Sequence, residues 1–403
     1  MNTLLKDILL ATLTALFFSA FIYFEHYGLT SKLINTLFGL AALALFLYIS
    51  KRAVLFAGFM IGLLWFYWIG YSFKYQGVGY MTPIVTIGFA FIYMLFFAPL
   101  AFTNNPLIRA VLLFALSFFE PLDWNWMQPE LLFVNSYFGV YKYQFALILL
   151  ALSLPSVMPF KKYYNYSALL LLVVALNYGY PLQQNAPLKI KLVQTDIKQE
   201  DKWQEKNLYP TVSMLFQEIQ KAIEQKYDLI ILPESVFPLF MNKTPELIKQ
   251  LKKFSYNITI VAGSLLNEDG KNYNVTYMFD KGNYQIAKKL VLVPFGEYIP
   301  LPKFAQKFIN DTFFSGASDF VTAKHPTDFI IKGVKFRNAI CYEATCKELY
   351  EGDVKYMIAM SNNAWFAPSI EPTLQKLLLE YYARKNGVTI YHAANYKGTG
   401  IIQ

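Results

Sequence analysis

The chain has 403 residues, enough for two or three domains, and 55% of these residues are hydrophobic. Together with an aromatic content of 18% and a positive mean hydropathy, this composition excludes an ordinary soluble protein and indicates a membrane protein. The net charge of +9 is spread over the chain without a dense basic block, which argues against a nucleic-acid partner. Attraction to a lipid bilayer with anionic headgroups fits this charge better.

Cysteine and histidine are too few and too scattered for a metal centre. The two cysteines, Cys341 and Cys346, cannot form a disulfide framework or a cysteine-rich metal site. The three histidines, His26, His325 and His392, form no cluster with ligand spacing. We therefore predict no metal. We also expect no cofactor.

The first part of the chain is strongly apolar. Residues 1–181 contain nine Lys or Arg and five Asp or Glu, whereas the remainder contains 27 and 22. Most of the apolar stretches approach the roughly 20 residues that a membrane-spanning helix needs. They are residues 8–23, 33–50, 53–71, 81–102, 107–119, 143–160 and 164–178. The pattern predicts a transmembrane helical domain over residues 1–182 with about seven helices, of which the shorter fifth and seventh could instead be interfacial.

The basic residues predict the orientation of these helices. Lys6 precedes the first apolar run, and no small-residue cleavage site follows before Glu25, so we interpret this run as a retained helix rather than a signal peptide. A cytoplasmic amino terminus places most basic residues inside, namely Lys6, Lys51, Arg52, Arg109, Lys161 and Lys162, and leaves outside Lys32, Lys74 and Lys142. The positive-inside rule favours this orientation. After seven crossings, the second half of the chain would lie on the outer face, which is the periplasm in a Gram-negative bacterium.

The loop at residues 120–143 is rich in aromatic residues and would lie on the same outer face. Its Trp124 and Trp126 are typical of side chains that anchor a protein in the headgroup layer. A role of this loop as a lid or portal is the alternative.

The composition changes abruptly near residues 180–187, which read as a polar, proline-bearing linker. We place an α/β domain at residues 187–403. Apolar runs predict strands at 189–194, 229–232, 258–262, 273–279, 329–336, 338–341, 356–360 and 388–392. Apolar residues at helical spacing predict a helix over 212–223, and a second helix is expected at 372–385. This alternation predicts a mixed sheet or a sandwich covered by helices.

Three polar residues, Glu234, Lys289 and Cys341, stand at the ends of such apolar runs, where each would project from a strand end or an adjoining loop. Together they could act as a nucleophilic set, because a thiol with a pKa of about 8.5 needs a base at neutral pH. Glu234 could take that proton, while Lys289 and the backbone N–H of Tyr342 stabilise the tetrahedral intermediate. Taken singly, Glu234 and Lys289 could be surface salt-bridge residues, and Cys341 a buried core thiol.

The surroundings of these residues resemble the carbon–nitrogen hydrolase (nitrilase) superfamily. LPES at 232–235, KKLVLVPFGEYIP at 288–300 and ICYE at 340–343 are similar to its glutamate, lysine and cysteine motifs, in the same order. Within that superfamily, LVPFGEY, SNNAWF at 361–366 and the preceding apolar helices resemble the apolipoprotein N-acyltransferase family. The resemblance implies a multi-pass α-helical membrane domain followed by a nitrilase-like α-β-β-α sandwich.

The resemblance also implies roles for individual residues. It makes Glu234 the general base, Lys289 the oxyanion stabiliser and Cys341 the nucleophile. Glu297 matches an acidic residue that positions the lysine and the reacting groups.

Three further positions, Trp203, Tyr342 and Glu343, match residues that are important in the family. Contact with substrate is one interpretation of each. The structural alternatives are an apolar plug, a ring packed on the sheet and a charge at a helix amino terminus, respectively.

The implied reaction is a ping-pong acyl transfer. A phospholipid would donate its acyl chain to Cys341, and the α-amino group of a diacylglyceryl-cysteine at the amino terminus of an apolipoprotein would accept it. Both substrates are lipids, so the membrane domain would hold the site near the bilayer. The resemblance places the protein in the bacterial inner membrane with its catalytic domain on the periplasmic side, and we expect a monomer.

Two other functions and one redox state remain as alternatives. A membrane-tethered amidase would use the same triad with water as acceptor, although seven helices are excessive for an anchor. A transporter or structural protein would not need an intact Glu, Lys, Cys set. A disulfide between Cys341 and Cys346 would remove the nucleophile, and periplasmic oxidation favours such bonds.

The carboxy terminus departs from the family pattern. Family members usually carry further strand and a final transmembrane helix after the segment that here reads NYKGTGIIQ. We therefore expect residues 187–403 to lack the final strands of the sandwich and the last transmembrane helix.

Overall fold

The chain folds into two compact units, Met1–Tyr180 and Pro181–Gln403, which we call the amino-terminal and carboxy-terminal units. The computed structural model describes residues 3–156, 166–181, 183–294, 296–298 and 320–403. Lys161 and Lys162 of the predicted orientation lie outside the described residues. The same holds for Phe295, Ile299 and Pro300 of the lysine motif.

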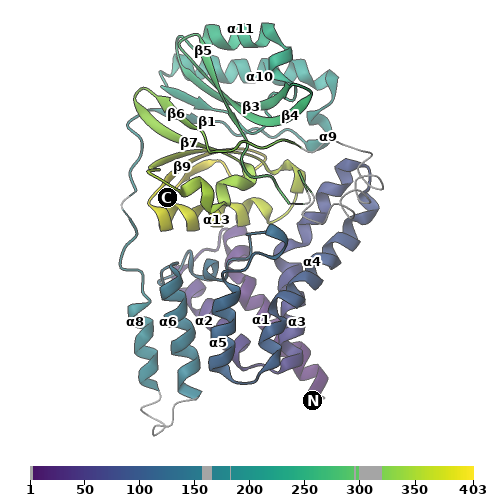
Figure 1. The fold of residues 1–403 in the computed structure, drawn as a ribbon, viewed down its shortest axis with the longest axis vertical. Coiled ribbons are helices and arrows are strands. Elements are labelled where there is room, and N and C mark those ends of the chain that lie inside the picture. Colours follow the sequence, from purple (N-terminus) through teal and green to yellow (C-terminus); the bar gives the residue numbers. More distant parts are fainter. Residues whose placement is uncertain (1–2, 157–165, 182, 295, 299–319) are drawn as a thin grey trace. The chain divides into compact units, whose positions relative to one another are not determined.

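The described part of the amino-terminal unit is built from helices (Figure 1). Its α-helices are α1 (Thr3–His26), α2 (Lys32–Tyr48), α3 (Lys51–Phe66), α4 (Thr82–Phe97), α5 (Pro106–Leu116), α6 (Lys142–Ser153) and α8 (Leu171–Val174). Between and beside them lie the 3₁₀ helices η1 (Tyr67–Gln76), η2 (Gly79–Met81), η3 (Ala98–Phe102), η4 (Pro121–Asp123), η5 (Pro129–Phe133), η6 (Leu154–Ser156) and η7 (Tyr166–Leu170). Each of the seven predicted apolar stretches therefore contains helix.

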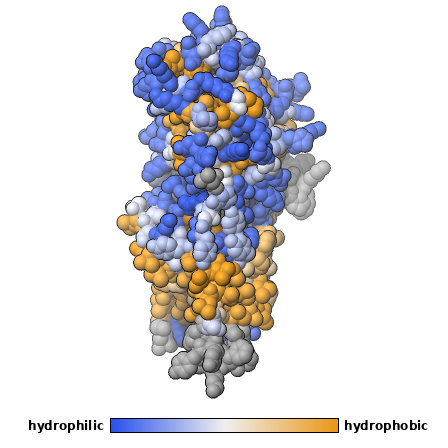
Figure 2. Space-filling model, turned by 90° about the vertical axis from the view of Figure 1, so that its left-hand side faces the viewer, coloured by the Kyte–Doolittle hydropathy of each residue, from blue (hydrophilic) through white to orange (hydrophobic). Residues whose placement is uncertain are grey.

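Three helical segments of the described chain are long and apolar enough to cross a membrane: Thr3–His26, Lys51–Gln76 and Gly79–Phe102. Lys32–Tyr48, Pro106–Leu116 and Lys142–Ser156 are apolar but shorter. Large apolar side chains such as Leu16, Leu37 and Leu95 are exposed on this unit, which Figure 2 shows as a mostly orange surface. The surface of the carboxy-terminal unit is mostly blue. The structure confirms an apolar helical unit, whereas the number of crossings stays a prediction.

Small residues bring α3 and α4 into close contact. A Cβ atom added to Gly58 would lie 3.0 Å from the carbonyl oxygen of Tyr93, and one added to Gly62 would lie 2.8 Å from the Cα of Ala90. Helices that pack in a membrane use small residues in this way, because van der Waals contact between backbones replaces the hydrophobic effect.

Trp124 and Trp126 are buried inside the amino-terminal unit. The ring of Trp126 lies 5.4 Å from that of Trp68, and the ring of Trp124 lies 6.1 Å from that of Phe66. Rings that anchor a protein in headgroups must reach its surface. The anchor interpretation is therefore wrong for these two residues, which instead fill the core of the unit.

Two five-stranded sheets form the centre of the carboxy-terminal unit. The first contains, in spatial order, β1 (Ile190–Leu192), β2 (Leu229–Ile231), β3 (Thr259–Glu268), β4 (Lys271–Asp280) and β5 (Asn283–Lys288). The second contains β10 (Gly400–Ile402), β9 (Thr389–Asn395), β8 (Tyr356–Asn362), β7 (Val334–Ile340) and β6 (Asp328–Ile331). The runs β1–β2–β3 and β7–β8–β9 are parallel, and the outer strands are antiparallel. The α-helices in the described residues of this unit are α9 (Gln199–Lys202), α10 (Glu205–Glu224), α11 (Pro245–Phe254) and α13 (Glu371–Asn386).

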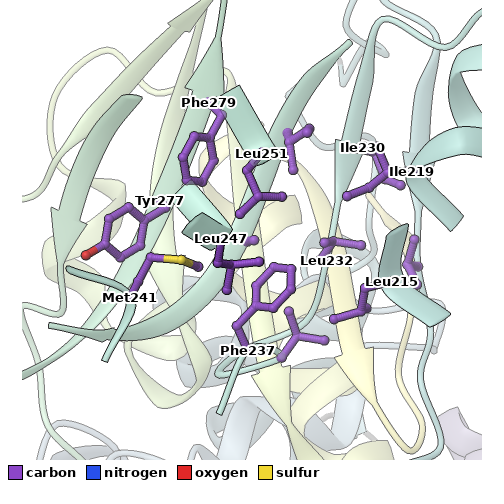
Figure 3. Close-up of a cluster of buried hydrophobic side chains, with 14 of the residues drawn as sticks. Leu215, Ile219, Ile230, Leu232, Phe237, Met241, Leu247, Leu251, Tyr277 and Phe279 are labelled. Atoms are coloured by element: carbon purple, nitrogen blue, oxygen red, sulfur yellow. The ribbon is translucent and has the colours of Figure 1, made fainter. Parts of the chain in front are cut away.

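Alternate residues of each strand face opposite sides of the first sheet, as the pleat requires. Ile230 of β2 packs toward α10 and α11, in a cluster with Leu215 and Leu251 (Figure 3). Its neighbours Leu229 and Ile231 face the second sheet and share a cluster with apolar residues of β7, β8 and β9. The unit is thus a helix–sheet–sheet–helix sandwich with α13 on the second sheet (Figure 1), which confirms the predicted fold class.

The structure corrects three details of the predicted elements. The run 329–336 is not one strand, because a tight turn at Lys332 and Gly333, with φ of 48° and 82°, separates β6 from β7. The strand before Cys341 ends at Ile340. The helix α11 and the edge strand β5 were not predicted, because both segments are rich in polar residues.

Candidate active site

Glu234 follows β2, at the carboxyl end of the parallel strands of the first sheet. Its backbone passes so close to β3 that a Cβ atom on Gly263 would lie 2.4 Å from the backbone nitrogen of Ser235, a contact that only glycine avoids. The buried Glu234 side chain accepts one hydrogen bond from the Asn274 amide at 2.8 Å and another from the backbone N–H of Asn362 at 2.8 Å. Both carboxylate oxygens are thereby fixed, and the second bond joins the two sheets.

Lys289 follows β5 and is 1% exposed. Its Nζ lies 2.7 Å from Oε2 of Glu297 and 3.9 Å from Oε1 of Glu234. Asn274 donates to the same two carboxyl groups, at 2.8 Å to Glu234 and 3.3 Å to Glu297. Burial alone would lower the pKa of Lys289, but the carboxylates of Glu297 and Glu234 outweigh it and raise this pKa above its usual value. Lys289 is therefore a permanent cation between two carboxyl groups.

Cys341 lies at the sharp turn where β7 ends and the 3₁₀ helix η9 (Cys341–Thr345) begins. Its φ of 56° is strained for a residue other than glycine, and such strain is typical of the turn that presents a nucleophile above a sheet. The Sγ atom lies 3.9 Å from Nε2 of Gln375 on α13. Burial and the nearby Glu234 raise the pKa of the Cys341 thiol, and Lys289 only partly offsets them. The resting thiol is therefore neutral and needs a base.

Glu343 holds the lysine segment against the cysteine strand. Its Oε2 accepts hydrogen bonds from the backbone N–H groups of Leu290 at 2.7 Å and Val291 at 3.1 Å. Its Oε1 accepts one from the backbone N–H of Ile340 at 2.6 Å. The side chain is buried, and it joins the residues just after Lys289 to the residue just before Cys341. Its role is positional.

We expect Glu343→Gln to slow acylation of Cys341 by up to about 100-fold, because small misplacements of reacting groups have effects of that order. One of the two oxygens becomes an NH₂ group that cannot accept an N–H, so the free energy of unfolding should also fall by about 2 kcal/mol. Thermal unfolding in detergent and trapping of the acyl-enzyme measure the two effects. Glu348→Gln, five residues along, is the control and should change neither.

Burial raises the pKa of Glu343 to about 7, although Lys289 and three backbone N–H groups oppose this. The folded state therefore holds the proton more tightly than the unfolded chain, whose carboxyl keeps the ordinary value of 4.5. The contribution to stability is complete below the unfolded value and is lost as the pH rises through about 7. The melting temperature of Glu343→Gln should depend less on pH across this window than that of the wild type. Parallel curves would contradict the assignment.

Trp203 follows the short helix α9 and is 47% exposed, so it is not an apolar plug. The buried residue here is its neighbour Lys202, which the sequence did not single out. The Nζ atom of Lys202 donates to the carbonyl oxygen of Glu234 at 3.0 Å. Burial lowers the pKa of Lys202 to about 8, against the opposing effect of Glu234 and Cys341. Lys202 thus fixes the backbone at Glu234.

Tyr342 is buried and directly follows Cys341 at the start of η9. Its carbonyl oxygen accepts a hydrogen bond from the hydroxyl of Thr345 at 2.7 Å, which fixes the turn. The position next to the thiol is where an oxyanion donor is needed. Tyr342 is 3% exposed, so its ring is buried.

The sequence missed several polar residues that the fold brings to this site: Lys202, Asn274, Glu371 and Gln375. Asn274 is a polar residue inside an apolar strand, NYNVTY, and that interruption was the available signal. Lys202 adjoins Trp203, which the family resemblance had already singled out. Glu371 and Gln375 lie on a helix of mixed composition and carry no local signal.

The site therefore combines a fixed carboxylate, a buried cation and a neutral thiol at a strained turn. Lys289 meets Glu234 and Glu297 directly, and the electrostatic effects of Glu234 and Lys289 on Cys341 bring the thiol into the same group. Such a set can remove the proton of a thiol and stabilise a tetrahedral intermediate, which is the chemistry of acyl transfer.

Comparison with known proteins places both units in families. Residues 5–178 match the apolipoprotein N-acyltransferase integral membrane domain, and residues 189–400 match the carbon–nitrogen hydrolase family. An apolipoprotein N-acyltransferase of Wolinella succinogenes is 43% identical over 98% of this chain and 96% of its own length. The chain belongs to the apolipoprotein N-acyltransferase family. A second apolipoprotein N-acyltransferase, from Helicobacter hepaticus, is 39% identical over 92% of this chain and 94% of its own length.

Among solved structures, a carbon–nitrogen hydrolase superfamily protein from Xanthomonas campestris, XC1258, covers 52% of this chain and 76% of its own length. The two are 16% identical with a TM-score of 0.40. The sequence matches, rather than this likeness, confirm the resemblance to the nitrilase superfamily and to the apolipoprotein N-acyltransferase family within it.

Proposed function

We propose that the chain moves an acyl group from a phospholipid to the α-amino group of a diacylglyceryl-cysteine, through a thioester on Cys341. As a member of its family the chain is an acyltransferase of the inner membrane that acts on lipoproteins. The donor, the thioester and the residue roles belong to the proposal. The observation that carries them is the buried Lys289, paired with Glu297 and next to Glu234, beside a thiol at a strained turn.

In the first half-reaction, Glu234 takes the thiol proton as the sulfur attacks the ester carbonyl. The oxyanion of the tetrahedral intermediate is stabilised by Lys289 and the backbone N–H of Tyr342. The ester C–O bond then breaks, the leaving glycerol oxygen takes up a proton, and a lysophospholipid departs. Glu234 suits the base role because its two oxygens are held in fixed positions by Asn274 and Asn362.

In the second half-reaction, the α-amino group of the acceptor attacks the thioester. The nitrogen loses a proton as the amide bond forms, and the C–S bond breaks with return of a proton to sulfur. Glu297 keeps Lys289 in place through both steps, because its Oε2 also accepts the backbone N–H of Val293 at 2.9 Å. The product is a lipoprotein with three acyl chains.

Lipid substrates give a physical reason for an apolar helical unit in the same chain. Each acyl CH₂ group exposed to water costs about 0.8 kcal/mol, so a site at the bilayer surface avoids a large penalty. Exclusion of water also protects the thioester from hydrolysis. Family membership therefore favours the transferase over the amidase that the triad alone would permit.

The decisive experiment mixes the purified protein with phospholipid and a synthetic diacylated lipopeptide, and then measures the peptide mass. A gain of one acyl chain supports the transferase. An unchanged peptide with accumulating free fatty acid would mean that water is the acceptor, and the hydrolase alternative would replace the proposal.

Contacts in the amino-terminal unit support a common side for its basic residues. The hydroxyl of Ser50 donates to Asp7 at 2.6 Å, which brings the start of α1 and the start of α3 together. Lys51 donates to the carbonyl oxygen of Phe102 at 3.1 Å. The buried Arg109 donates to the carbonyl oxygen of Ile49, at the end of α2, at 2.6 Å. Among the described residues assigned to the cytoplasm, Lys51 and Arg109 thus lie at the same end of the helices.

We expect the carboxy-terminal unit to lie in the periplasm, as the distribution of basic residues predicts. Alkaline phosphatase fused after Pro187 should be active, because this enzyme needs export, and a cytoplasmic reporter at the same position should be silent. The matched fusion after Lys51 should give the opposite pattern. Activity of the cytoplasmic reporter after Pro187 would overturn the orientation and, with it, access to lipoproteins.

A further inference from the structure

Glu371 is a buried carboxyl group close enough to act electrostatically on the thiol of Cys341, and the triad does not use it. It lies in the first turn of α13 and is 1% exposed. Within the described part of the chain, its Oε2 atom is buried without a hydrogen-bond partner, and no lysine or arginine forms an ion pair with it. A carboxylate left in this state costs several kcal/mol, so such a group is normally paired, or neutral, or used.

The position of Glu371 on α13 places it on the helix face that borders the reaction centre. Gln375 is four residues along the helix, so the two side chains share one face. The Nε2 atom of Gln375 lies 3.9 Å from Sγ of Cys341, while its Oε1 accepts a hydrogen bond from Asn363 at 3.1 Å. This face of α13 is therefore a wall of the site, on the side of the second sheet. Glu234 and Lys289 come from the first sheet.

Glu371 and Glu234 have different surroundings. Glu234 has the Lys289 ammonium at 3.9 Å and accepts hydrogen bonds from two N–H donors. Burial raises the pKa of Glu371 well above its usual value, and the charge of Glu234 raises it further. Of these two carboxyl groups, one is thus paired with a cation and the other is buried without a hydrogen-bond partner for its Oε2 atom among the described residues. A difference of this kind between the environments of two carboxyl groups separates a base from an acid in other enzymes.

We propose that Glu371 is a second catalytic carboxyl group, the general acid that protonates the glycerol oxygen of the departing lysophospholipid. The inference rests on the proposed function, because it assigns the proton that the first half-reaction requires. An alkoxide is a poor leaving group, so the C–O bond of a phospholipid ester breaks readily only if its oxygen receives a proton.

The protons balance over the two half-reactions. In the first, Glu234 takes the thiol proton, the S–C bond forms, the C–O bond breaks, and Glu371 gives its proton to the leaving oxygen. In the second, the amine nitrogen forms the amide bond and passes a proton to Glu371. The C–S bond breaks, and Glu234 returns its proton to the sulfur. In the resting enzyme and again in the thioester, one of Glu234 and Glu371 holds a proton and the other does not, so the protons balance over the cycle.

The test compares two donors of the same fatty acid in single-turnover acylation of Cys341, followed by the mass of the intact protein. One donor is the phospholipid. The other is the p-nitrophenyl ester, whose phenolate leaves without a proton. Glu371→Gln preserves the volume and removes the acidic proton. Glu380→Gln, on the same helix but paired with Lys376 and Arg384, is the control.

We expect Glu371→Gln to slow acylation from phospholipid by at least about 100-fold and acylation from the p-nitrophenyl ester by less than about threefold. Glu371→Asp, which restores an acidic proton, should recover part of the rate with phospholipid. Equal slowing with both donors would make Glu371 a structural residue, and no slowing with either would make it a bystander. Failure of the wild type to react with phospholipid, while it reacts with the p-nitrophenyl ester, would instead refute the proposed donor.

Discussion

Cys341→Ala should reduce acyl transfer by about 10⁶-fold or to the limit of detection, because loss of a covalent nucleophile has effects of that order. No thioester should form with phospholipid. The protein should remain folded in the membrane, because the side chain is only half-buried and its Sγ has one weak contact, to Gln375. Alanine tolerates the φ of 56° no worse than cysteine does.

Cys346→Ser is the matched control, and it should retain acyl transfer. Cys346 is buried five residues from the nucleophile, where its thiol donates to the carbonyl oxygen of Tyr342 at 3.5 Å. A serine hydroxyl can make the same bond. Equal loss of activity in the two variants, with both thiols free in the wild type, would assign Cys346 a role in the reaction.

The redox state of the two cysteines provides a separate check on the nucleophile. Neither cysteine forms a disulfide in the described structure, and the thiol of Cys346 is directed to the backbone of η9. A disulfide would consume the thiol that the reaction needs. The mass of the active protein after alkylation should therefore show two modified cysteines. A disulfide between Cys341 and Cys346 in active protein would refute the nucleophile assignment.

The sequence could predict the three central residues because each stands at an end of an apolar run, Glu234 and Cys341 after one and Lys289 before one. Parallel strands end at the same edge of their sheet, so polar residues after Leu232 and Ile340 were expected to lie near the reaction centre. Pairing of Lys289 with Glu297 could also be expected, because the family motif joins them. The exposure of the Trp203 side chain could not be predicted, because the burial of a side chain depends on residues that are distant in the sequence.

Residues that support the triad were beyond local sequence signals. Asn274 bridges Glu234 and Glu297 from the middle of β4, and Gln375 reaches the thiol from α13. Each is remote in sequence from the groups that it contacts. Only the packing of the two sheets and α13 brings them together, so an unusual polar residue was the most that the sequence could offer.

The prediction of secondary structure failed where a mostly polar composition hid the spacing of the apolar residues. The helix α11 has Leu247 and Leu251 on its buried face, but its other residues are mostly charged or polar. The edge strand β5 exposes most of its residues, so it lacks an apolar run. By contrast, long apolar helices such as α1 and α4 are specified by local hydropathy alone, which explains why all seven apolar stretches contained helix.

Lys289→Met should lower the rate of acylation of Cys341 by about 10²- to 10³-fold, the effect of losing one oxyanion donor. It should also destabilise the carboxy-terminal unit by about 3 kcal/mol, because Glu297 is left without its cation in a buried site. Thermal unfolding in detergent and single-turnover acylation with phospholipid measure the two effects. The loss of stability alone could reduce activity, so a second variant is needed.

The double variant Lys289→Met/Glu297→Gln separates the two causes. Removal of the Glu297 charge relieves the uncompensated carboxylate, so the melting temperature should return most of the way to that of the wild type. The rate of acylation should stay low, because no cation then faces the tetrahedral intermediate. Glu297→Gln alone should lose less activity, since Lys289 remains and still has Glu234 at 3.9 Å. If the acylation rate instead recovered together with the melting temperature, Lys289 would be a structural cation, and the stabilisation of the oxyanion would have to come from the backbone N–H of Tyr342.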